Sequence, residues 1–124
     1  MSRGERVTVV EVGPRDGLQN EKGFVPTEVK VAFVEALADA GLGVVETTAF
    51  VSPRAIPQLA DSAEVFSRVR KRPGVRYPVL VPNEKGLSRA LAAGAREISL
   101  FTAATDTFNL RNTNATVEES FARF

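Results

Sequence analysis

An arginine and an aspartate stand side by side in a short polar segment whose residue types could do chemistry. Arg15 and Asp16 follow the pair Gly13-Pro14, and Gln19 comes three residues after the aspartate. Aspartate supplies the oxygen ligands that Mg²⁺ and Mn²⁺ prefer. Arginine keeps its charge and can hold an oxyanion through two parallel hydrogen bonds, as a reaction that forms an enolate requires. Pro-Arg-Asp-Gly is also good turn chemistry, so a plain turn is the alternative.

The segment before this pair has the pattern of a buried strand. Residues 7–12 are rich in valine, and Gly13-Pro14 cannot continue a strand. Ligands of parallel α/β sheets and barrels bind at the carboxyl ends of the strands. We therefore expect Arg15 and Asp16 to lie where ligands of such a fold are bound.

Glu46 lies inside a second apolar run, residues 44–48. A charge is costly in a strand that is covered on both faces, unless it is paired. We predict that Glu46 lies near the site, where it pairs with Arg15 or contacts the ligands of a metal; the alternative is a solvent-facing position on an edge strand. Gln19 is expected either to contact substrate or to cap its own loop, and Asn83 is expected to cap a helix.

Composition excludes several classes of protein. The chain has 124 residues, of which 44% are hydrophobic and 25% are charged, and its net charge is +1, so it gives no electrostatic case for binding nucleic acid or a membrane surface. It contains neither cysteine nor histidine, which removes disulfides, a thiol nucleophile and the commonest metal ligand. The first residues lack the apolar core of a signal peptide, so we expect a cytoplasmic protein.

Strand and helix patterns alternate along the chain. The second helix is expected to begin with a capping box, Asp61 to Glu64, and the fourth with another, Thr116 to Glu119. In the first helix we predict that the buried stripe is Val29, Ala32, Phe33, Ala36, Leu37 and Ala40. Strands are predicted at residues 7–12, 44–48, 77–81 and 97–101; helices at 27–40, 61–71, 83–94 and 116–124; and long loops at 13–25, 49–60 and 102–115.

These alternating elements predict an α/β fold. A closed (β/α)8 barrel takes about 250 residues, so four strand–helix units in 124 residues predict the N-terminal half of a TIM barrel. The loops after strands are long and the loops after helices are short, as in barrels, where the working loops follow the strands. We expect residues 1–124 to be a partial barrel domain that stops within its fourth helix.

The polar segment resembles a known enzyme family. The block from Gly13 to Glu21, Gly-Pro-Arg-Asp-Gly-Leu-Gln-Asn-Glu, is similar to the opening motif of the hydroxymethylglutaryl-CoA lyases, which belong to a superfamily of metal-dependent Claisen-type lyases and synthases. The segment Glu46-Thr47-Thr48, followed by Phe50-Val51-Ser52-Pro53, matches another segment of the family. The resemblance extends from Val7 to Phe124.

The resemblance implies a reaction and roles for the residues. These lyases cleave 3-hydroxy-3-methylglutaryl-CoA to acetyl-CoA and acetoacetate with a divalent metal, in leucine degradation and ketone body metabolism. By analogy, Asp16 would bind Mg²⁺ or Mn²⁺, Arg15 would bind substrate and stabilise the enolate oxygen, Glu46 would line the active site, and Gln19 would contact substrate. An acyl-CoA is the implied partner, and the full-length parent is expected to form a homo-oligomer.

The resemblance also shows what this chain lacks. The family's remaining metal ligands, two histidines and an asparagine, and its catalytic cysteine belong to the second half of the barrel, and this chain has no histidine or cysteine. We therefore expect the chain to be inactive alone. Two alternatives remain: a relative of the isopropylmalate or homocitrate synthases, against which Gly13-Pro14 argues, and a non-catalytic half-barrel that assembles with another chain.

A basic cluster ends the second predicted helix. It consists of Arg68, Arg70, Lys71 and Arg72. A CoA-binding patch is one interpretation, but a solvated helix end is favoured, because cations stabilise the carboxyl end of a helix and this end faces away from the expected site.

Overall fold

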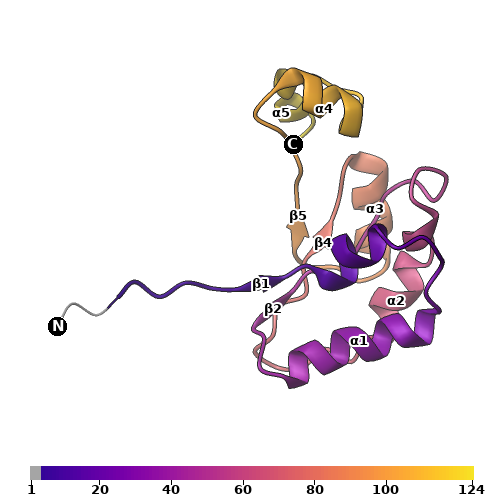
Figure 1. Cartoon of the computed structure of the whole chain (residues 1–124), viewed down its shortest axis with the longest axis vertical. Coiled ribbons are helices and arrows are strands. Elements are labelled where there is room, and N and C mark those ends of the chain that lie inside the picture. Colours follow the sequence, from indigo (N-terminus) through magenta and orange to yellow (C-terminus); the bar gives the residue numbers. More distant parts are fainter. Residues whose placement is uncertain (1–3) are drawn as a thin grey trace.

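The computed structural model describes residues 4–124, and its strands and helices alternate along the chain (Figure 1). A π-helical turn, η1 (Gly13–Gly17), and a 3₁₀ turn, η2 (Pro57–Leu59), lie in the loops that follow β1 and β3. Within the described residues, the strands are β1 (Val10–Glu11), β2 (Val44–Val45), β3 (Thr48–Ala49), β4 (Val79–Leu80) and β5 (Ile98–Ser99), and the α-helices are α1 (Thr27–Asp39), α2 (Ser62–Arg68), α3 (Glu84–Ala92), α4 (Asp106–Thr113) and α5 (Val117–Arg123).

The strands lie side by side, and every strand pair within residues 4–124 is parallel. β1 pairs with β2, while β3, β4 and β5 form a second ladder in that order. β2 and β3 are two parts of one extended path, because the amides of Val45 and Thr47 donate to the carbonyls of Arg76 and Pro78, both at 3.0 Å. The predicted order of consecutive parallel strands is therefore confirmed, although the ladders are shorter than the predicted strands. The predicted burial of the first strand is wrong: Val7, Val9 and Val10 are 86%, 63% and 46% exposed, because among the described residues β1 pairs only with β2.

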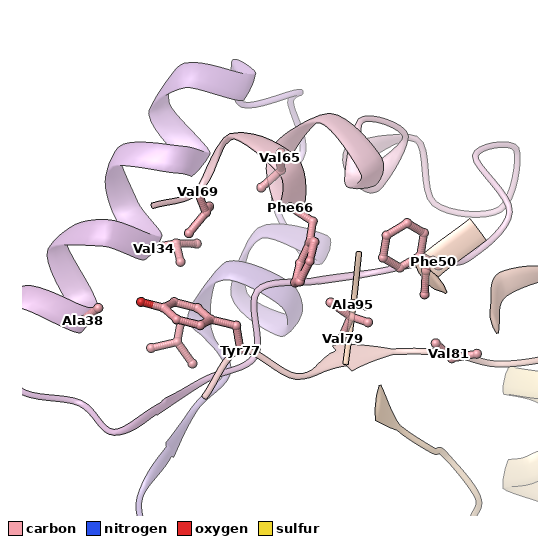
Figure 2. Close-up of a cluster of buried hydrophobic side chains, with 12 residues drawn as sticks. Val34, Ala38, Phe50, Val65, Phe66, Val69, Tyr77, Val79, Val81 and Ala95 are labelled. Carbon is pink, nitrogen blue, oxygen red and sulfur yellow. The ribbon is translucent and has the colours of Figure 1, made fainter. Parts of the chain in front are cut away.

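Helices α1 and α2 pack against the strands and enclose the main hydrophobic core (Figure 2). Val34 of α1 and Val65 of α2 are fully enclosed, and Tyr77, just before β4, lies beside them. Burial of these side chains supplies the main stabilisation of the helix layer, since each large apolar side chain contributes about 1.5–3 kcal/mol when removed from water. The buried core cluster comprises Val34, Ala38, Val45, Phe50, Val65, Phe66, Val69, Tyr77, Val79, Val81, Ala90 and Ala95.

The predicted buried stripe of α1 is wrong. Lys30, Val34 and Ala38 are the buried residues of this helix, whereas Val29 is 51% exposed and Phe33 37% exposed. Apolar residues occupy both sides of α1, so periodicity alone selected the wrong stripe. The helix turns its lysine inward because a carboxylate and a carbonyl are there to receive the ammonium group.

Two predicted caps are confirmed and one is wrong. Asn83 Oδ1 accepts from the Gly86 amide at 2.9 Å, and Thr116 forms the predicted capping box with Glu119. Asp61 precedes α2, but its side chain makes no capping bond. Its carboxylate instead binds Thr27 and Lys30 on α1, an interaction that no local pattern encodes.

The loop predicted at residues 102–115 is wrong, because it contains α4. Thr105 caps this helix by accepting from the Phe108 amide, and Asn114 ends it with a left-handed φ of 54°. Asn109 is fully buried and donates to the carbonyls of Ala115 and Thr116, which holds α4 against the start of α5. These tertiary hydrogen bonds stabilise a helix whose sequence is mostly polar.

None of the helices within residues 4–124 is both long enough and apolar enough to span a bilayer.

Candidate active site

The turn that carries Arg15 and Asp16 forms directly after β1. The Val12 carbonyl accepts from the amides of Arg15 and Asp16, at 3.1 and 2.7 Å, and Pro14 supplies a suitable φ at the start of the turn. The Gly13 amide donates to Glu11 Oε1 at 2.8 Å. A Cβ on residue 13 would lie 2.9 Å from that oxygen, so a larger residue here would displace the Glu11 carboxylate.

Arg15 and Glu46 form an ion pair across the sheet. The Arg15 Nε donates to Glu46 Oε1, while its Nη1 lies 3.0 Å from Asp16 Oδ1. The Arg15 side chain is 19% exposed and that of Glu46 is 8% exposed. The structure thus brings together the first loop and the path between β2 and β3, and the predicted pairing of Glu46 with Arg15 is confirmed.

Ser99 of β5 joins this pair, and we did not predict it. Its hydroxyl lies 3.3 Å from Glu46 Oε2, within hydrogen-bonding distance. The two carboxylate oxygens of Glu46 therefore have different partners, with Arg15 on one and Ser99 on the other. A serine in a largely apolar strand gives only weak evidence of a functional position. Its role can be assigned only when its neighbour in the folded protein, here Glu46, is known.

Asp16 is the most accessible acid of the cluster, with a side chain that is 54% exposed. Its carboxylate has the oxygen chemistry that Mg²⁺ and Mn²⁺ prefer. Across residues 4–124, however, no three or more His, Cys, Asp or Glu side chains are grouped so as to hold a metal. The described residues therefore fit one ligand of a divalent metal and do not complete its coordination.

Gln19 is close in sequence to Arg15 and Asp16, but no donor within residues 4–124 reaches its side-chain carbonyl oxygen. Its Oε1 atom is buried and has no hydrogen-bond partner within residues 4–124, as is also true of Thr102 Oγ1 after β5. The loop is capped instead by Asn20, whose side-chain amide donates to the Asp16 carbonyl at 2.8 Å. The expectation that Gln19 caps its own loop therefore finds no support, and its Oε1 is an acceptor that still needs a donor.

The three arginines of the predicted basic cluster are solvated, whereas Lys71 packs over the Phe66 ring. Arg68 pairs with Glu64 at 3.1 Å, and Arg72 pairs with Asp39 at 2.7 Å. All four of these side chains are about half exposed. Arg68 ends α2 and the other three residues lie between α2 and β4, in a connection that precedes a strand, which agrees with the favoured interpretation of a helix end.

The fold and the polar group formed by Arg15, Asp16, Glu46 and Ser99 define a parallel α/β protein of the barrel type, with polar side chains gathered at the ends of the strands. The model of the HMGL-like family matches residues 6–124. The chain belongs to that family.

Individual relatives agree with this assignment. The chain is 55% identical over 120 residues to the mitochondrial hydroxymethylglutaryl-CoA lyase of Rattus norvegicus, a match that covers 97% of this chain and 37% of the relative. It is 57% identical to the cytoplasmic 3-hydroxy-3-methylglutaryl-CoA lyase of the same species, covering 97% of this chain and 35% of that protein. The chain thus spans less than two fifths of the length of these relatives.

A solved structure shows the same arrangement of elements. An HMG-CoA lyase from Acenitobacter baumannii, in complex with coenzyme A and 3-methylmalate, superposes with a TM-score of 0.90 at 44% identity. The superposition covers 94% of this chain and 38% of that one. The parallel α/β fold of this chain therefore corresponds to part of a lyase barrel.

Proposed function

We propose that this chain supplies part of the active site of a hydroxymethylglutaryl-CoA lyase. The reaction is the cleavage of 3-hydroxy-3-methylglutaryl-CoA to acetyl-CoA and acetoacetate. The observation that carries the proposal is the arginine beside an accessible aspartate, fixed by a buried glutamate from the neighbouring strand. The identity to lyases of the family supports the same reaction.

In the proposed mechanism, Arg15 stabilises negative charge. The tertiary hydroxyl of the substrate loses its proton, the adjacent carbon–carbon bond breaks to give acetoacetate, and the electron pair forms the enolate of acetyl-CoA, which is then protonated. The Arg15 guanidinium donates to the enolate oxygen, where the charge develops. Glu46 holds the guanidinium in position through Nε, so that little reorganisation is needed during the reaction.

Asp16 is the proposed metal ligand of this chain. A divalent metal, Mg²⁺ or Mn²⁺, would act as a Lewis acid and orient the substrate when bound. The ion pair with Arg15 holds the Asp16 carboxylate beside the guanidinium, so the ligand and the oxyanion donor would face the same substrate. The remaining ligands must come from outside the described residues.

An acyl-CoA is the proposed small-molecule partner. The solved lyase in complex with coenzyme A and 3-methylmalate supports a CoA ester with a branched hydroxy acid as the ligand class. Gln19 is proposed to bind this substrate, since its buried Oε1 can accept a hydrogen bond. Nucleic acid and membrane are not expected partners, because the net charge is only +1.

The biological setting follows from the same proposal. A lyase of this kind would serve leucine degradation and ketone body metabolism. We propose a cytoplasmic location, because the first residues lack the apolar core of a signal peptide, and a homo-oligomer for the complete enzyme; the names of the relatives include both mitochondrial and cytoplasmic lyases. We also propose that residues 1–124 form the first strand–helix units of the catalytic barrel.

An activity assay tests the proposed reaction. The chain is incubated with hydroxymethylglutaryl-CoA and Mg²⁺ or Mn²⁺, alone and with a polypeptide that covers the remaining length of a homologous lyase. We expect no turnover by the chain alone, because one carboxylate does not make a metal site, and turnover in the mixture. Turnover by the chain alone would refute the proposed need for further ligands, and a folded mixture without turnover would count against the lyase reaction.

A metal titration tests Asp16 without any need for activity. In the mixture with the polypeptide that covers the remaining length of a homologous lyase, paramagnetic Mn²⁺ should broaden the NMR signals of residues 15–17 before those of other acidic sites of this chain. Asp16→Asn should abolish the local broadening, while Glu64→Gln on the exposed face of α2 serves as the control. Equal broadening at Asp16 and Glu64 would contradict a specific role for Asp16.

A further inference from the structure

Lys30 is a buried charge that the proposed mechanism does not use. It lies on α1 and is 3% exposed. Its Nζ is 2.6 Å from Asp61 Oδ1, donates to the Gln58 carbonyl, and lies 4.2 Å from the centre of the Phe24 ring. The other carboxylate oxygen of Asp61 accepts from Thr27 Oγ1 at 2.7 Å. The ammonium group thus meets an anion, a carbonyl and an aromatic face.

We propose that Lys30 is a positioning residue for the Arg15–Asp16 turn. Lys30, Gln58 and Asp61 form a clamp that fixes the loop after β3 to α1. Gln58 then reaches across to the first loop, where its side-chain amide donates to the Glu21 carbonyl at 2.9 Å. The clamp therefore joins the loop that follows Glu46 to the loop that carries Arg15.

The contacts continue from Glu21 back to the site. The neighbouring residue, Asn20, donates through its side chain to the Asp16 carbonyl at 2.8 Å. The Glu21 amide donates to the Leu18 carbonyl and that of Asn20 to the Gly17 carbonyl, both at 3.2 Å. This stretch is therefore a hydrogen-bonded turn with one end at Asp16 and the other held by Gln58. This inference rests on the proposed function, because that function is what makes the Arg15–Asp16 turn part of an active site.

A charge at this position has a physical reason beyond packing. A buried ion pair is often replaceable by apolar residues without loss of stability, so burial alone does not explain it. An ammonium group, however, can donate to Gln58 and Asp61 at once, which apolar side chains cannot do. The clamp therefore fixes the position of a loop, and this effect is separable from its contribution to stability.

The experiment separates position from stability. Amide hydrogen exchange is measured for the chain, for Lys30→Met, and for the double variant Lys30→Met/Asp61→Leu, which buries no unpaired charge. We expect the double variant to retain the unfolding midpoint of the parent while exchange in residues 17–25 and 52–61 rises about tenfold. Exchange in α3 should not change. The matched control is Glu64→Ala, which breaks the exposed pair of Glu64 with Arg68 on α2 and should leave both loops unchanged.

A measurement on the unsubstituted chain covers the case in which the variants fail to fold. Amine labelling of Lys30 should be about 100-fold slower than that of Lys22, because only Lys30 is enclosed. Labelling of Lys30 at the rate of Lys22, or a folded double variant with unchanged loop exchange, would overturn the clamp. Neither result depends on turnover or on Mn²⁺ binding at Asp16, so failure of the clamp and failure of the proposed function are distinguishable.

Discussion

Two of the arginine–glutamate pairs within residues 4–124 lie at opposite ends of the strands, and they differ in burial. Arg15 and Glu46 meet after β1, with side chains that are 19% and 8% exposed. Arg76 and Glu97 meet before β4 and β5, with side chains that are 62% and 35% exposed. The same two residue types therefore form one largely buried pair and one exposed pair.

The difference in burial indicates which of the two pairs can take part in catalysis. In the exposed pair, Arg76 Nε lies 3.0 Å from Glu97 Oε2, and the hydrogen bond and charge of Glu97 raise the pKa of Arg76. Water and salt screen such a pair, and it contributes little to stability. In the enclosed pair each charge depends on its partner, so the guanidinium is held in one orientation next to Asp16. A fixed donor is what an enolate-forming reaction uses.

The largest effect is expected from Glu46→Gln, which would break the enclosed pair. The variant leaves Arg15 without its buried counter-ion, and we expect the free energy of unfolding to fall by about 3 kcal/mol. Urea unfolding measures this change. In the mixture with the complementary polypeptide, turnover should fall by about 100-fold, since the oxyanion donor is no longer fixed. A variant as stable and active as the parent would show that the pair is incidental.

Ser99→Ala tests the smaller contribution of the hydroxyl group that contacts Glu46 in the buried pair. The substitution removes the hydroxyl that lies 3.3 Å from Glu46 Oε2 and keeps the Arg15 pair. The expected loss is about 1 kcal/mol in the free energy of unfolding, because a single long hydrogen bond is lost. Urea unfolding of Ser99→Ala and Ser99→Thr provides the measurement, and Thr, which keeps the hydroxyl, should be closer to the parent. Equal losses in both variants would assign the effect to packing.

Glu97→Gln breaks the exposed pair and is the counterpart of Glu46→Gln. We expect a much smaller change in the unfolding midpoint, and one that disappears when the salt concentration is raised, because the pair is solvated. Thermal unfolding at low and high ionic strength measures it. A loss comparable to that of Glu46→Gln would show that exposure does not separate the two pairs.

The smallest effect concerns Lys71, beside the exposed pair. Its Nζ lies 3.9 Å from the centre of the Phe66 ring, and burial lowers the pKa of Lys71 below its ordinary value of 10.5. The unfolded chain therefore binds more protons than the folded chain between the two pKa values, so stability should rise slightly as the pH rises through this alkaline window. Lys71→Met should remove the rise, as followed by urea midpoints across alkaline pH. An identical pH profile in the variant would contradict the assignment to Lys71.

Local patterns were sufficient for much of the fold. The end of the first strand before Gly13-Pro14, the cap at Asn83 and the capping box at Thr116 were all predicted, because each depends on residues within a few positions of one another. The length and the burial of that strand were not, because they depend on which segments cover it. The pairing of Glu46 with Arg15 was also predicted, since a charge in a covered strand needs a partner. The role of Asp16 as a metal ligand stays a prediction.

Contacts between residues far apart in the chain could not be predicted from local sequence patterns. We did not predict the contact of Ser99 or the clamp of Lys30, Gln58 and Asp61, because the residues in these contacts are 28 to 53 positions apart in the chain. The helix α4 was missed because its polar sequence gives no stripe, and Asn109 stabilises it by tertiary hydrogen bonds. Asp61 was assigned to a cap because the local pattern fitted and the distant lysine was unknown.

Sequence patterns alone specify the parallel α/β class, the turn that presents Arg15 and Asp16, and membership of a lyase-like family, because strand periodicity, glycine and proline chemistry and the nine-residue motif act locally. Folding establishes which face of α1 is buried and that Ser99 contacts the carboxylate that holds Arg15 in place. It also joins two distant loops through a buried lysine. The reason is that burial and charge pairing depend on the groups that folding brings together, and these groups lie far apart along the chain.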